Sequence, residues 1–492
     1  MFPMLEKSIL PEGRPPNIGA LFLDQCHIYD ESVALSFRDG SDVKTVTYGK
    51  LAKIVRDIAG GVASRGLGPG ARALVVAHNT PEWVFAFYAI HVCGGVDVCV
   101  NPALPHSVII QLARQIKPAV ALVEDPDLGE LLEQEGKIKV IFLNWKKEGY
   151  KNLRSLRQRF TFLGQGHKRR QPDHEASIVF KKSDPELQQP GGLILSHGSI
   201  IKNVEAYTSS LPGTQQDRLM IRAPLWHSSG RLGMLTALSR GIELQLSRKD
   251  VLDDCEALQP TLLLAHPSTL DAIETRVFEG GESGGMLGNL FMRAYIFFGA
   301  EAMRAMNHLT GQTAVFGSSE KQSFVGLVID LVLLIFLLPV KILGDGLFGT
   351  RLRKRFGGSL RCVLTGGAPV RGRLDLFFGM LGVSVLAAYF KTEACHVIAS
   401  RILEYTGQRS RLQPGTVGPP LAGAEIKILQ AGSDVSSTPG AVGEIMIRGD
   451  FLFQGYLSGQ SDVFDASGWF YTGDRGSLSN QGELRIARRD ER

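Results

Sequence analysis

Residues 71–100 read ARALVVAHNTPEWVFAFYAIHVCGGVDVCV. The stretch opens with a β-rich run, continues with an apolar, helix-like run at 81–95, and closes with a second β-rich run after two glycines. Further helix-like runs lie on either side of it, at 45–67 and at 107–116. Strands that alternate with helices in this way predict parallel sheets joined by crossover helices.

From residue 414 onward the pattern changes. The segments GTVGPPLAGAEIKIL, AVGEIMIRG, GWFYTGD and GELRIA are short and β-rich, and glycine and proline separate them. Such segments predict a small antiparallel subdomain that follows the α/β part of the chain.

Composition limits the class of protein. The chain has 492 residues, more than a typical compact domain, which fits one large α/β unit with subdomains. Its net charge of +5 is too small to indicate nucleic-acid binding. The six cysteines form no CxxC pair, so we expect reduced, buried thiols. The N-terminal sequence contains no apolar run long enough for a signal peptide, so we expect a cytoplasmic protein.

One apolar run needs a separate interpretation. Residues 325–338, VGLVIDLVLLIFLL, are apolar except for Asp330, and we expect Pro339 to end the run. It is shorter than the ~20 residues of a spanning helix, so we expect a buried or surface-lying helix. The basic run 351–355 follows closely, as in segments that rest on anionic lipid. Of the two interpretations, we favour a core helix followed by a solvated basic turn over membrane contact.

Seven motifs follow one another along the chain. They are TYGKLA (47–52), NTPEW (79–83), LTGGAP (364–369), YFKTE (389–393), GTVGPPLAG (415–423), GEIMIRG (443–449) and GWFYTGD (468–474). In this order they resemble the adenylate-forming superfamily, which includes acyl-CoA synthetases, luciferases and the adenylation domains of peptide synthetases. The apolar run before FGGSLRCVLTGGAP is most similar to the long-chain fatty acid–CoA ligases.

The resemblance implies an adenine site at LTGGAP and YFKTE. Gly366 and Gly367 let the backbone approach a flat ligand closely. With Ala368 and Pro369 they match the strand end that contacts adenine and the acyl pocket in the family. Tyr389 offers a ring face for stacking on the adenine.

Other matched positions are implied to bind the rest of the nucleotide. Asp474 matches the residue that receives both ribose hydroxyls, and Arg489 aligns with an arginine on the ribose. Thr392 can hydrogen-bond phosphate, and Glu393 can bind Mg²⁺, which usually takes carboxylates together with substrate phosphates.

Two further matched positions concern the acyl group. Trp226 and His227, in APLWHSSG, match family positions near the acyl-adenylate and its acyl pocket. In YFKTE, Phe390 stands where the family has glycine, and this bulky residue is expected to crowd the nucleotide.

The phosphate loop departs from the family pattern. The family reads roughly TSGTTGxPKG, whereas residues 181–191 read KKSDPELQQPG. Pro185 lacks an N–H donor, and Asp184 and Glu186 would repel a triphosphate. Lys181 and Lys182 cannot supply the backbone N–H geometry that cradles phosphates, so we expect no working cradle here.

A second departure lies at the C-terminal end. The family continues from GELRIA through a hinge into a small lid with a catalytic lysine, whereas this sequence reads RRDER up to Arg492. We expect residues 1–413 to form paired α/β subdomains, 414–485 a small β-rich subdomain, and 486–492 a hinge remnant without a lid.

The resemblance implies an α/β fold of two stacked subdomains plus a small β-barrel. It further implies an ATP-dependent long-chain fatty acid–CoA ligase that uses ATP, Mg²⁺ and CoA to form acyl-adenylate and then acyl-CoA. Two alternatives stay open: an inactive homologue that binds nucleotide or fatty acid, and one half of a split enzyme whose partner chain carries the lid. We expect no nucleic-acid partner, and peripheral contact with a membrane stays open.

Overall fold

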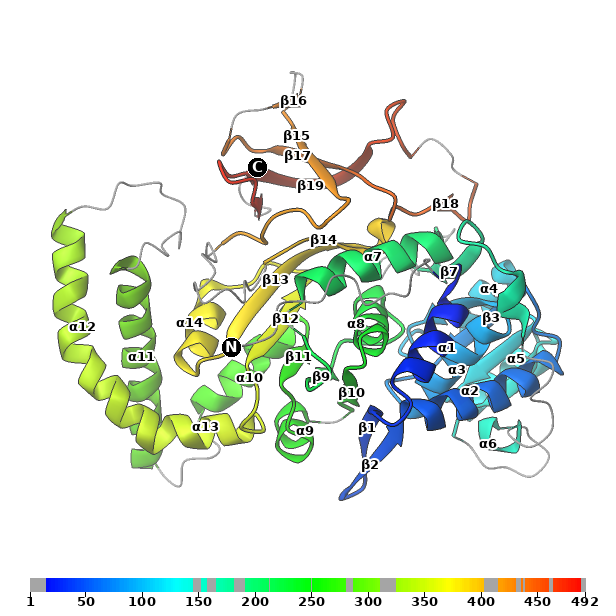
Figure 1. The fold of residues 1–492 in the computed structure, drawn as a ribbon, viewed down its shortest axis with the longest axis horizontal. Helices are drawn as coiled ribbons and strands as arrows, with labels where there is room; N and C mark the ends of the chain where they lie inside the picture. Colours follow the sequence, from blue (N-terminus) through cyan, green and yellow to red (C-terminus); the bar gives the residue numbers. More distant parts are fainter. Residues whose placement is uncertain are drawn as a thin grey trace.

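The computed structural model contains two α/β units and a small β-sheet (Figure 1). It describes residues 15–144, 152–156, 165–180, 191–211, 213–248, 250–279, 286–309, 324–401, 415–430, 435–436, 439–459 and 463–487.

The first unit is built on a seven-stranded sheet. In spatial order its strands are β18 (Gly455–Tyr456), β8 (Leu193–Ser196), β7 (Glu175–Val179), β4 (Val96–Val100), β3 (Arg72–Val76), β5 (Val120–Val123) and β6 (Lys139–Phe142). From β7 to β6 all neighbours are parallel, whereas β8 pairs antiparallel with both β7 and β18. The alternation around residues 71–100 predicted the parallel part correctly.

Helices cover both faces of this sheet. They are α1 (Ile18–Ile28), α2 (Tyr48–Ala63), α3 (Pro81–Val92), α4 (His106–Ile116) and α5 (Pro126–Gln134). Successive strand residues point to opposite faces: Val75 packs in the core that contains α2 and α3, whereas Leu74 packs with α4 and α5. Thr80 begins α3, because its hydroxyl accepts from the backbone N–H of Trp83 at 3.1 Å.

The second unit is built on an eight-stranded sheet. In spatial order its strands are β14 (His396–Ser400), β13 (Ser384–Lys391), β12 (Cys362–Gly366), β11 (Leu262–Leu264), β9 (Arg218–Ile221), β10 (Glu243–Leu246), β1 (Val33–Asp39) and β2 (Asp42–Thr47). The six strands from β13 to β1 run parallel, and the edge strands β14 and β2 are antiparallel.

This sheet also has two covered faces. Leu262 and Leu264 belong to the core that the two units share, and Leu263 belongs to a separate core on the far side. The shared core contains α7 (His197–Ser210) and α8 (Ser228–Ser239); the far core contains α9 (Val251–Leu258), α10 (Pro267–Glu279) and α14 (Gly372–Met380). Short helices Leu153–Leu156, Gly166–Arg169 and Thr392–Ala394 complete the two units.

A five-stranded antiparallel sheet forms the small β subdomain. In spatial order its strands are β16 (Val435–Ser436), β15 (Glu425–Leu429), β17 (Gly443–Arg448), β19 (Phe470–Leu478) and β20 (Leu484–Ile486). Its outer strands β16 and β20 do not pair with each other in the described part of the chain, so the sheet is a half-barrel. The motif residue Thr472 ties two strands together by donating to the carbonyl of Ile445 at 2.7 Å.

A helical hairpin is inserted between β11 and β12. It consists of α11 (Met286–Leu309) and α12 (Phe324–Gly344), followed by a π-helical turn (Asp345–Gly349) and by α13 (Thr350–Arg355) (Figure 1). The prediction of a core helix that ends at Pro339 is wrong. Pro339 lies inside α12, and the apolar residues of α12 are exposed, with Phe336 72% exposed. The helix from Val328 to Arg355 is also long and apolar enough to cross a membrane.

The six cysteines are all free and buried, as the sequence predicted. Burial raises the pKa of the Cys362 thiol to about 12, so this thiol stays protonated and unreactive at neutral pH.

Candidate active site

Predicted site residues meet at one edge of the eight-stranded sheet. β9, β11, β12 and β13 are parallel neighbours, so the segments that follow them lie at the same edge. These segments carry Trp226 and His227 after β9, the turn 366–369 at the end of β12, and Thr392 and Glu393 after β13. Open α/β sheets bind their ligands outside the carboxyl ends of the strands, which makes this edge the candidate site.

The first part of the edge is held by Asn79 of the NTPEW motif. Its side-chain nitrogen donates to the carbonyl of Ala223 at 3.0 Å, and its oxygen accepts from the backbone N–H of Leu225 at 2.8 Å. Asn79 follows β3 in the other unit, so these bonds fix the segment before His227 relative to both sheets.

His227 begins α8 as its N-cap residue. Its Nδ1 accepts from the backbone N–H of Ser229 at 3.3 Å and lies 2.8 Å from the Ser229 hydroxyl. A ring nitrogen that accepts a hydrogen bond carries no proton, so the neutral ring is protonated on Nε2. Trp226 stands edge-on to this ring, with 5.7 Å between the ring centroids. The half-buried imidazole can therefore offer an N–H donor.

A buried ion pair fixes α8 between the two units. Nη1 of Arg231 lies 2.6 Å from Oδ2 of Asp97 in β4 and 2.6 Å from the Ser177 hydroxyl in β7. Burial alone would raise the pKa of Asp97, but Arg231 and His91 outweigh it and hold that pKa below its usual range. Asp97 is therefore ionised at neutral pH, and it keeps the helix that carries His227 in place.

The glycine turn at the end of β12 is partly filled by Phe390. A Cβ on Gly366 would lie 2.4 Å from the Ala388 carbonyl and 2.7 Å from the Phe390 ring, so Gly366 is required by packing. Gly367 has a φ of +82°. A Cβ added to it would lie 3.8 Å from the rings of both His266 and Phe390, which is ordinary van der Waals distance. This part of the turn remains open.

Ala368 and Pro369 follow Gly367 at the surface, and both are exposed. The exposed backbone from Gly367 to Pro369 is the part of the motif that can contact a flat ligand, with Phe390 and His266 as its neighbours. Phe390 packs closely against Gly366, and its predicted crowding of the nucleotide stays a prediction.

Tyr389, Lys391 and Asp474 form a polar cluster. The Tyr389 hydroxyl donates to Oδ2 of Asp474 at 2.6 Å, and Nζ of Lys391 lies 3.0 Å from the same oxygen. Burial raises the pKa of Tyr389, and the Asp474 carboxylate raises it further, so the phenol stays a donor. Tyr389 is only 7% exposed, so most of the ring face predicted to stack on adenine is covered.

The other carboxylate oxygen of Asp474 is open to a ligand. Oδ1 has no hydrogen-bond partner among the described residues, and the side chain is 39% exposed. A carboxylate held by one oxygen and open at the other can accept a hydroxyl donor such as a ribose hydroxyl.

Thr392 and Glu393 form the short 3₁₀ helix after β13. Thr392 is half-buried, and Glu393 is 3% exposed with its carbonyl accepting from the backbone N–H of Phe453 at 2.7 Å. No group of three or more His, Cys, Asp and Glu side chains that could hold a metal occurs in the described part of the chain. A single carboxylate still fits Mg²⁺ in a nucleotide site, where substrate phosphates and water complete the coordination.

Two predicted parts of the site lie outside the described residues. These are Arg489 and the segment 181–190 of the phosphate loop. The residues that follow this segment are described. Gly192 accepts from the backbone N–H of Leu457 at 2.6 Å, next to the pairing of β8 with β18.

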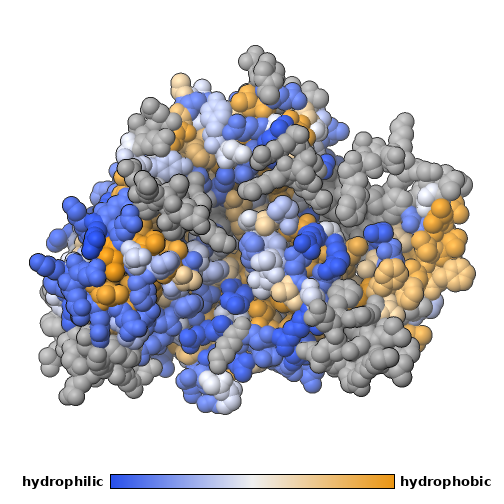
Figure 2. All heavy atoms as spheres, turned by 180° about the vertical axis from the view of Figure 1, so that it is seen from behind, coloured by the Kyte–Doolittle hydropathy of each residue, from blue (hydrophilic) through white to orange (hydrophobic). Residues whose placement is uncertain are grey.

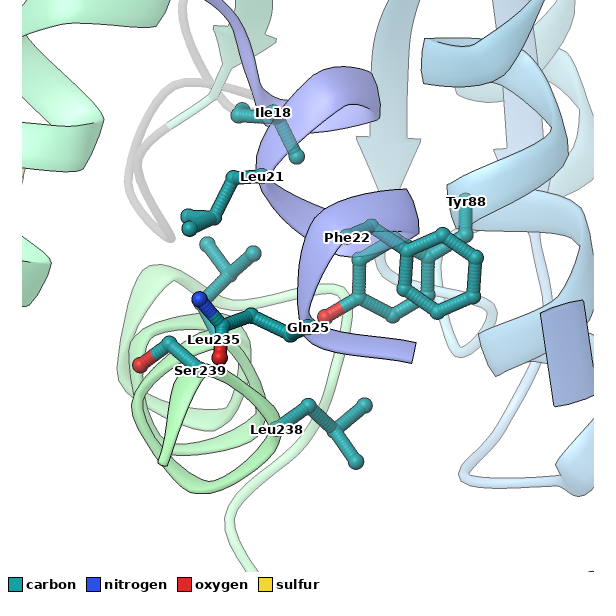
Figure 3. Close-up of a pocket in the computed structure, with 8 residues that line it drawn as sticks. All are labelled: Ile18, Leu21, Phe22, Gln25, Tyr88, Leu235, Leu238 and Ser239. Carbon is teal, nitrogen blue, oxygen red and sulfur yellow. The ribbon is translucent and has the colours of Figure 1, made fainter. Parts of the chain in front are cut away.

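A small cavity lies away from this edge, between α1, α3 and α8 (Figure 3). It is lined mainly by apolar side chains, among them Phe22, Tyr88 and Leu235. Gln25 also lines it, and its buried amide has no hydrogen-bond partner in the described structure. None of the predicted site residues lines this cavity, so it is not the predicted acyl pocket.

Sequence reasoning missed two residues of the edge. Lys391 lies inside the YFKTE motif, between the predicted site residues Tyr389 and Thr392. His266 follows β11, and its Nδ1 accepts from the backbone N–H of Ser268 at 3.3 Å. His227 and Ser229 show the same His-x-Ser arrangement. This spacing, repeated after two β-rich runs, was a signal that could have identified His266.

Comparison with known proteins places this geometry in a family. A family model described as AMP-binding enzyme matches residues 22–180 and 189–457, and the match omits 181–188. The omitted residues are those in which the phosphate loop departs from the family pattern.

Individual relatives agree with this match. Long chain acyl-CoA synthetase 3 of Arabidopsis thaliana is 25% identical over 91% of this chain and 67% of its own length. A chloroplastic long-chain-fatty-acid–[acyl-carrier-protein] ligase, AEE15, of the same plant is 21% identical over 92% of this chain and 65% of its own length. The chain thus spans about two thirds of the length of these relatives.

The fold agrees as well. The crystal structure of a long-chain-fatty-acid-CoA ligase, FadD1, from Archaeoglobus fulgidus superposes with a TM-score of 0.69 at 14% identity. The superposition covers 96% of this chain and 84% of that one.

Proposed function

The chain belongs to the AMP-binding enzyme family of adenylate-forming ligases, and we propose that it activates a long-chain fatty acid with ATP for transfer to CoA. In this reaction the fatty carboxylate attacks the α-phosphorus of ATP, and pyrophosphate leaves with the electron pair of the broken P–O bond. The CoA thiol then attacks the acyl carbon, and AMP leaves. The observation that carries the proposal is the convergence of His227, Gly367, Glu393 and Asp474 at one sheet edge and its neighbouring β subdomain.

Asp474 is proposed to hold the ribose. Its Oδ1 has no partner among the described residues, while Tyr389 and Lys391 fix Oδ2 and set the direction of the carboxylate. Lys391 also places a positive charge beside the ribose position, which favours an anionic nucleotide. The exposed turn from Gly367 to Pro369 is proposed to lie along the adenine.

Glu393 and Thr392 are proposed to serve the α-phosphate, the phosphate that AMP and ATP share. Glu393 would hold Mg²⁺, which neutralises charge on the phosphates when bound. Thr392 can donate its hydroxyl to a phosphate oxygen.

The acyl carboxylate is proposed to lie near His227 and Trp226. The Nε2 proton of His227 can donate to a carboxylate oxygen, and Trp226 supplies an apolar ring beside it. His266 repeats this donor after the neighbouring strand β11.

One observation favours a second candidate, a binding protein that does not form the adenylate. The family match omits residues 181–188, and in the sequence the acidic residues Asp184 and Glu186 stand where the family has its phosphate loop. Such a protein would bind nucleotide and fatty acid at the same edge without releasing pyrophosphate.

Pyrophosphate release separates the two candidates. With ATP, Mg²⁺ and a long-chain fatty acid, the ligase releases pyrophosphate, and Asp474→Ala should reduce that release by at least about tenfold, because a charge-assisted bond to the ribose is lost. Asp450→Ala, which changes an aspartate whose side chain is 82% exposed, serves as the matched control. Binding of AMP without any release of pyrophosphate would support the second candidate.

The acceptor thiol needs its own assay, because the similar plant proteins include both a CoA synthetase and an acyl-carrier-protein ligase. Acyl transfer should be measured with CoA and with holo acyl carrier protein at equal concentration. Product with CoA is expected. Transfer only to the carrier protein would contradict the proposed acceptor but leave the adenylation step intact.

A further inference from the structure

The hairpin inserted between β11 and β12 has its apolar side chains on the outside. Ten apolar residues of α12 between 328 and 343 are exposed, from 40% at Leu333 to 72% at Phe336. Phe297 on α11 is 60% exposed as well. Figure 2 shows hydrophobic atoms gathered at the end of the molecule where this hairpin lies. A contiguous apolar surface of this kind marks a contact with a protein or a membrane.

A polar cluster around Asp345 links the two helices of the hairpin. Nζ of Lys341 lies 2.6 Å from Oδ2 of Asp345, and the Tyr295 hydroxyl of α11 donates to Oδ1 of the same carboxylate at 2.6 Å. The side chain of Lys341 is only 16% exposed. A helix that neutralises its lysine with a carboxylate one turn further along, and that exposes its apolar residues, is suited to an apolar surrounding.

The sheet excludes a single membrane crossing by α12. The chain leaves the eight-stranded sheet after Leu264 and returns to it at Cys362, and these ends belong to the adjacent strands β11 and β12. One crossing between them would place neighbouring strands of the same sheet on opposite sides of a membrane. Among the described helices, α12 with its extension is the one helix long and apolar enough to be a candidate span.

Basic residues of α13 lie next to the apolar face. Arg353 and Arg355 bind protein groups, namely the carbonyl of Leu381 and the carboxylate of Glu256. Arg351 and Lys354 are exposed and have no ion-pair partner among the described residues. Positive charge beside an apolar helix face is complementary to anionic lipid headgroups.

We propose that α12 lies in the plane of an anionic membrane surface, with its apolar face among the acyl chains and with Arg351 and Lys354 at the headgroups. This attachment is independent of the proposed ligase activity. If the chain is such a ligase, membrane attachment places its candidate active site at the membrane in which a long-chain fatty acid dissolves.

Flotation of the full chain with vesicles tests the proposal. Binding is expected to phosphatidylcholine vesicles that contain phosphatidylserine, and it should weaken in high salt. The pair Ile335→Glu and Phe336→Glu should reduce binding by at least about tenfold, because two large apolar side chains leave the acyl region. The pair Ile28→Glu and Val43→Glu changes residues of similar type that are 51% and 45% exposed elsewhere, and should have no effect.

Depth measurements distinguish a lying helix from a crossing one. Ile329, Phe336 and Leu343 share one face of α12, and each can be replaced singly by cysteine. Because the native cysteines are all buried, a fluorophore can be attached selectively to the introduced one. Quenching by brominated lipid should indicate the same shallow depth at all three positions. A deep central position with shallow ends would overturn the in-plane arrangement.

Two other results would overturn membrane attachment itself. One is the absence of flotation by the folded chain at low salt. The other is a dimer in sedimentation that the Ile335→Glu and Phe336→Glu pair dissociates, without any vesicle binding, because a second copy would then cover the apolar face.

Discussion

The core between the two α/β units and the α11–α12 hairpin differ in which side chains they bury and which they expose. In the core, the ion pair of Arg231 and Asp97 is enclosed by apolar residues that water does not reach. In the hairpin, Lys341 pairs with Asp345 one turn further along, where the carboxylate stays 40% exposed, and the apolar side chains of α12 face outward. The difference shows that an apolar run predicts a helix, but not whether its side chains are buried within the protein.

The largest expected effect concerns the ion pair of the core. Asp97→Ala should lower the free energy of unfolding by about 3–5 kcal/mol, because Arg231 stays buried without a counter-charge. Asp345→Ala is the matched change in the hairpin. Its side chain is 40% exposed, so we expect a loss of about 1 kcal/mol or less. Urea unfolding measures both, and equal losses would remove the contrast between the two regions.

A second effect concerns His197, a buried residue at the start of α7. Burial lowers the pKa of His197 from 6.5 to about 2, with the nearby His91 and Arg170 adding to the shift. The unfolded chain therefore binds a proton below pH 6.5 that the folded chain does not. The stability that this neutral ring contributes is complete above pH 6.5 and is lost as the pH falls toward 2.

Urea unfolding at pH 7 and pH 5 tests this shift. Between these values the contribution of His197 should fall by about 2 kcal/mol. His197→Gln cannot take up the proton and should show a correspondingly smaller loss. His106→Gln, at a histidine whose side chain is 37% exposed, is the control. The same pH dependence in His197→Gln and the unaltered protein would contradict a neutral, buried His197.

Much of the fold was predictable because strand and helix periodicities are local. The alternation around 71–100 gave the parallel sheet, and the short β-rich segments after 414 gave the antiparallel subdomain. The order of strands was not predictable, since β11 and β12 are adjacent although nearly 100 residues separate them in the sequence. The exposure of α12 was predicted wrongly, because its apolar run alone reads like that of a core helix.

The site was predictable as a set of motifs but not as a set of contacts. Nothing in YFKTE or GWFYTGD indicated that Tyr389 and Lys391 would share one oxygen of Asp474, because that contact depends on how the β subdomain lies against β13. Phe390 was noticed as a departure, but its packing against Gly366 follows from the pairing of β12 with β13.

The smallest expected effect concerns the outer face of the hairpin. Phe336→Ser should change the free energy of unfolding in water by no more than about 0.5 kcal/mol, because this ring is 72% exposed. Phe378→Ser, at a fully buried ring of the far core, is the matched change and should destabilise the protein severely. A large loss for Phe336→Ser, measured by thermal or urea unfolding, would mean that the hairpin packs against protein on this face.

Calorimetric titration of AMP and ATP in the presence of Mg²⁺ tests the central claim most directly. The claim is that the nucleoside end of the site is intact at Asp474 while residues 181–188 supply no phosphate cradle. AMP and ATP should therefore bind with similar affinity, and Asp474→Ala should weaken both equally, whereas Asp450→Ala should weaken neither. Since each charge-assisted phosphate contact adds ~1.5–3 kcal/mol, a preference for ATP of about tenfold or more, or unchanged binding in Asp474→Ala, would contradict the claim.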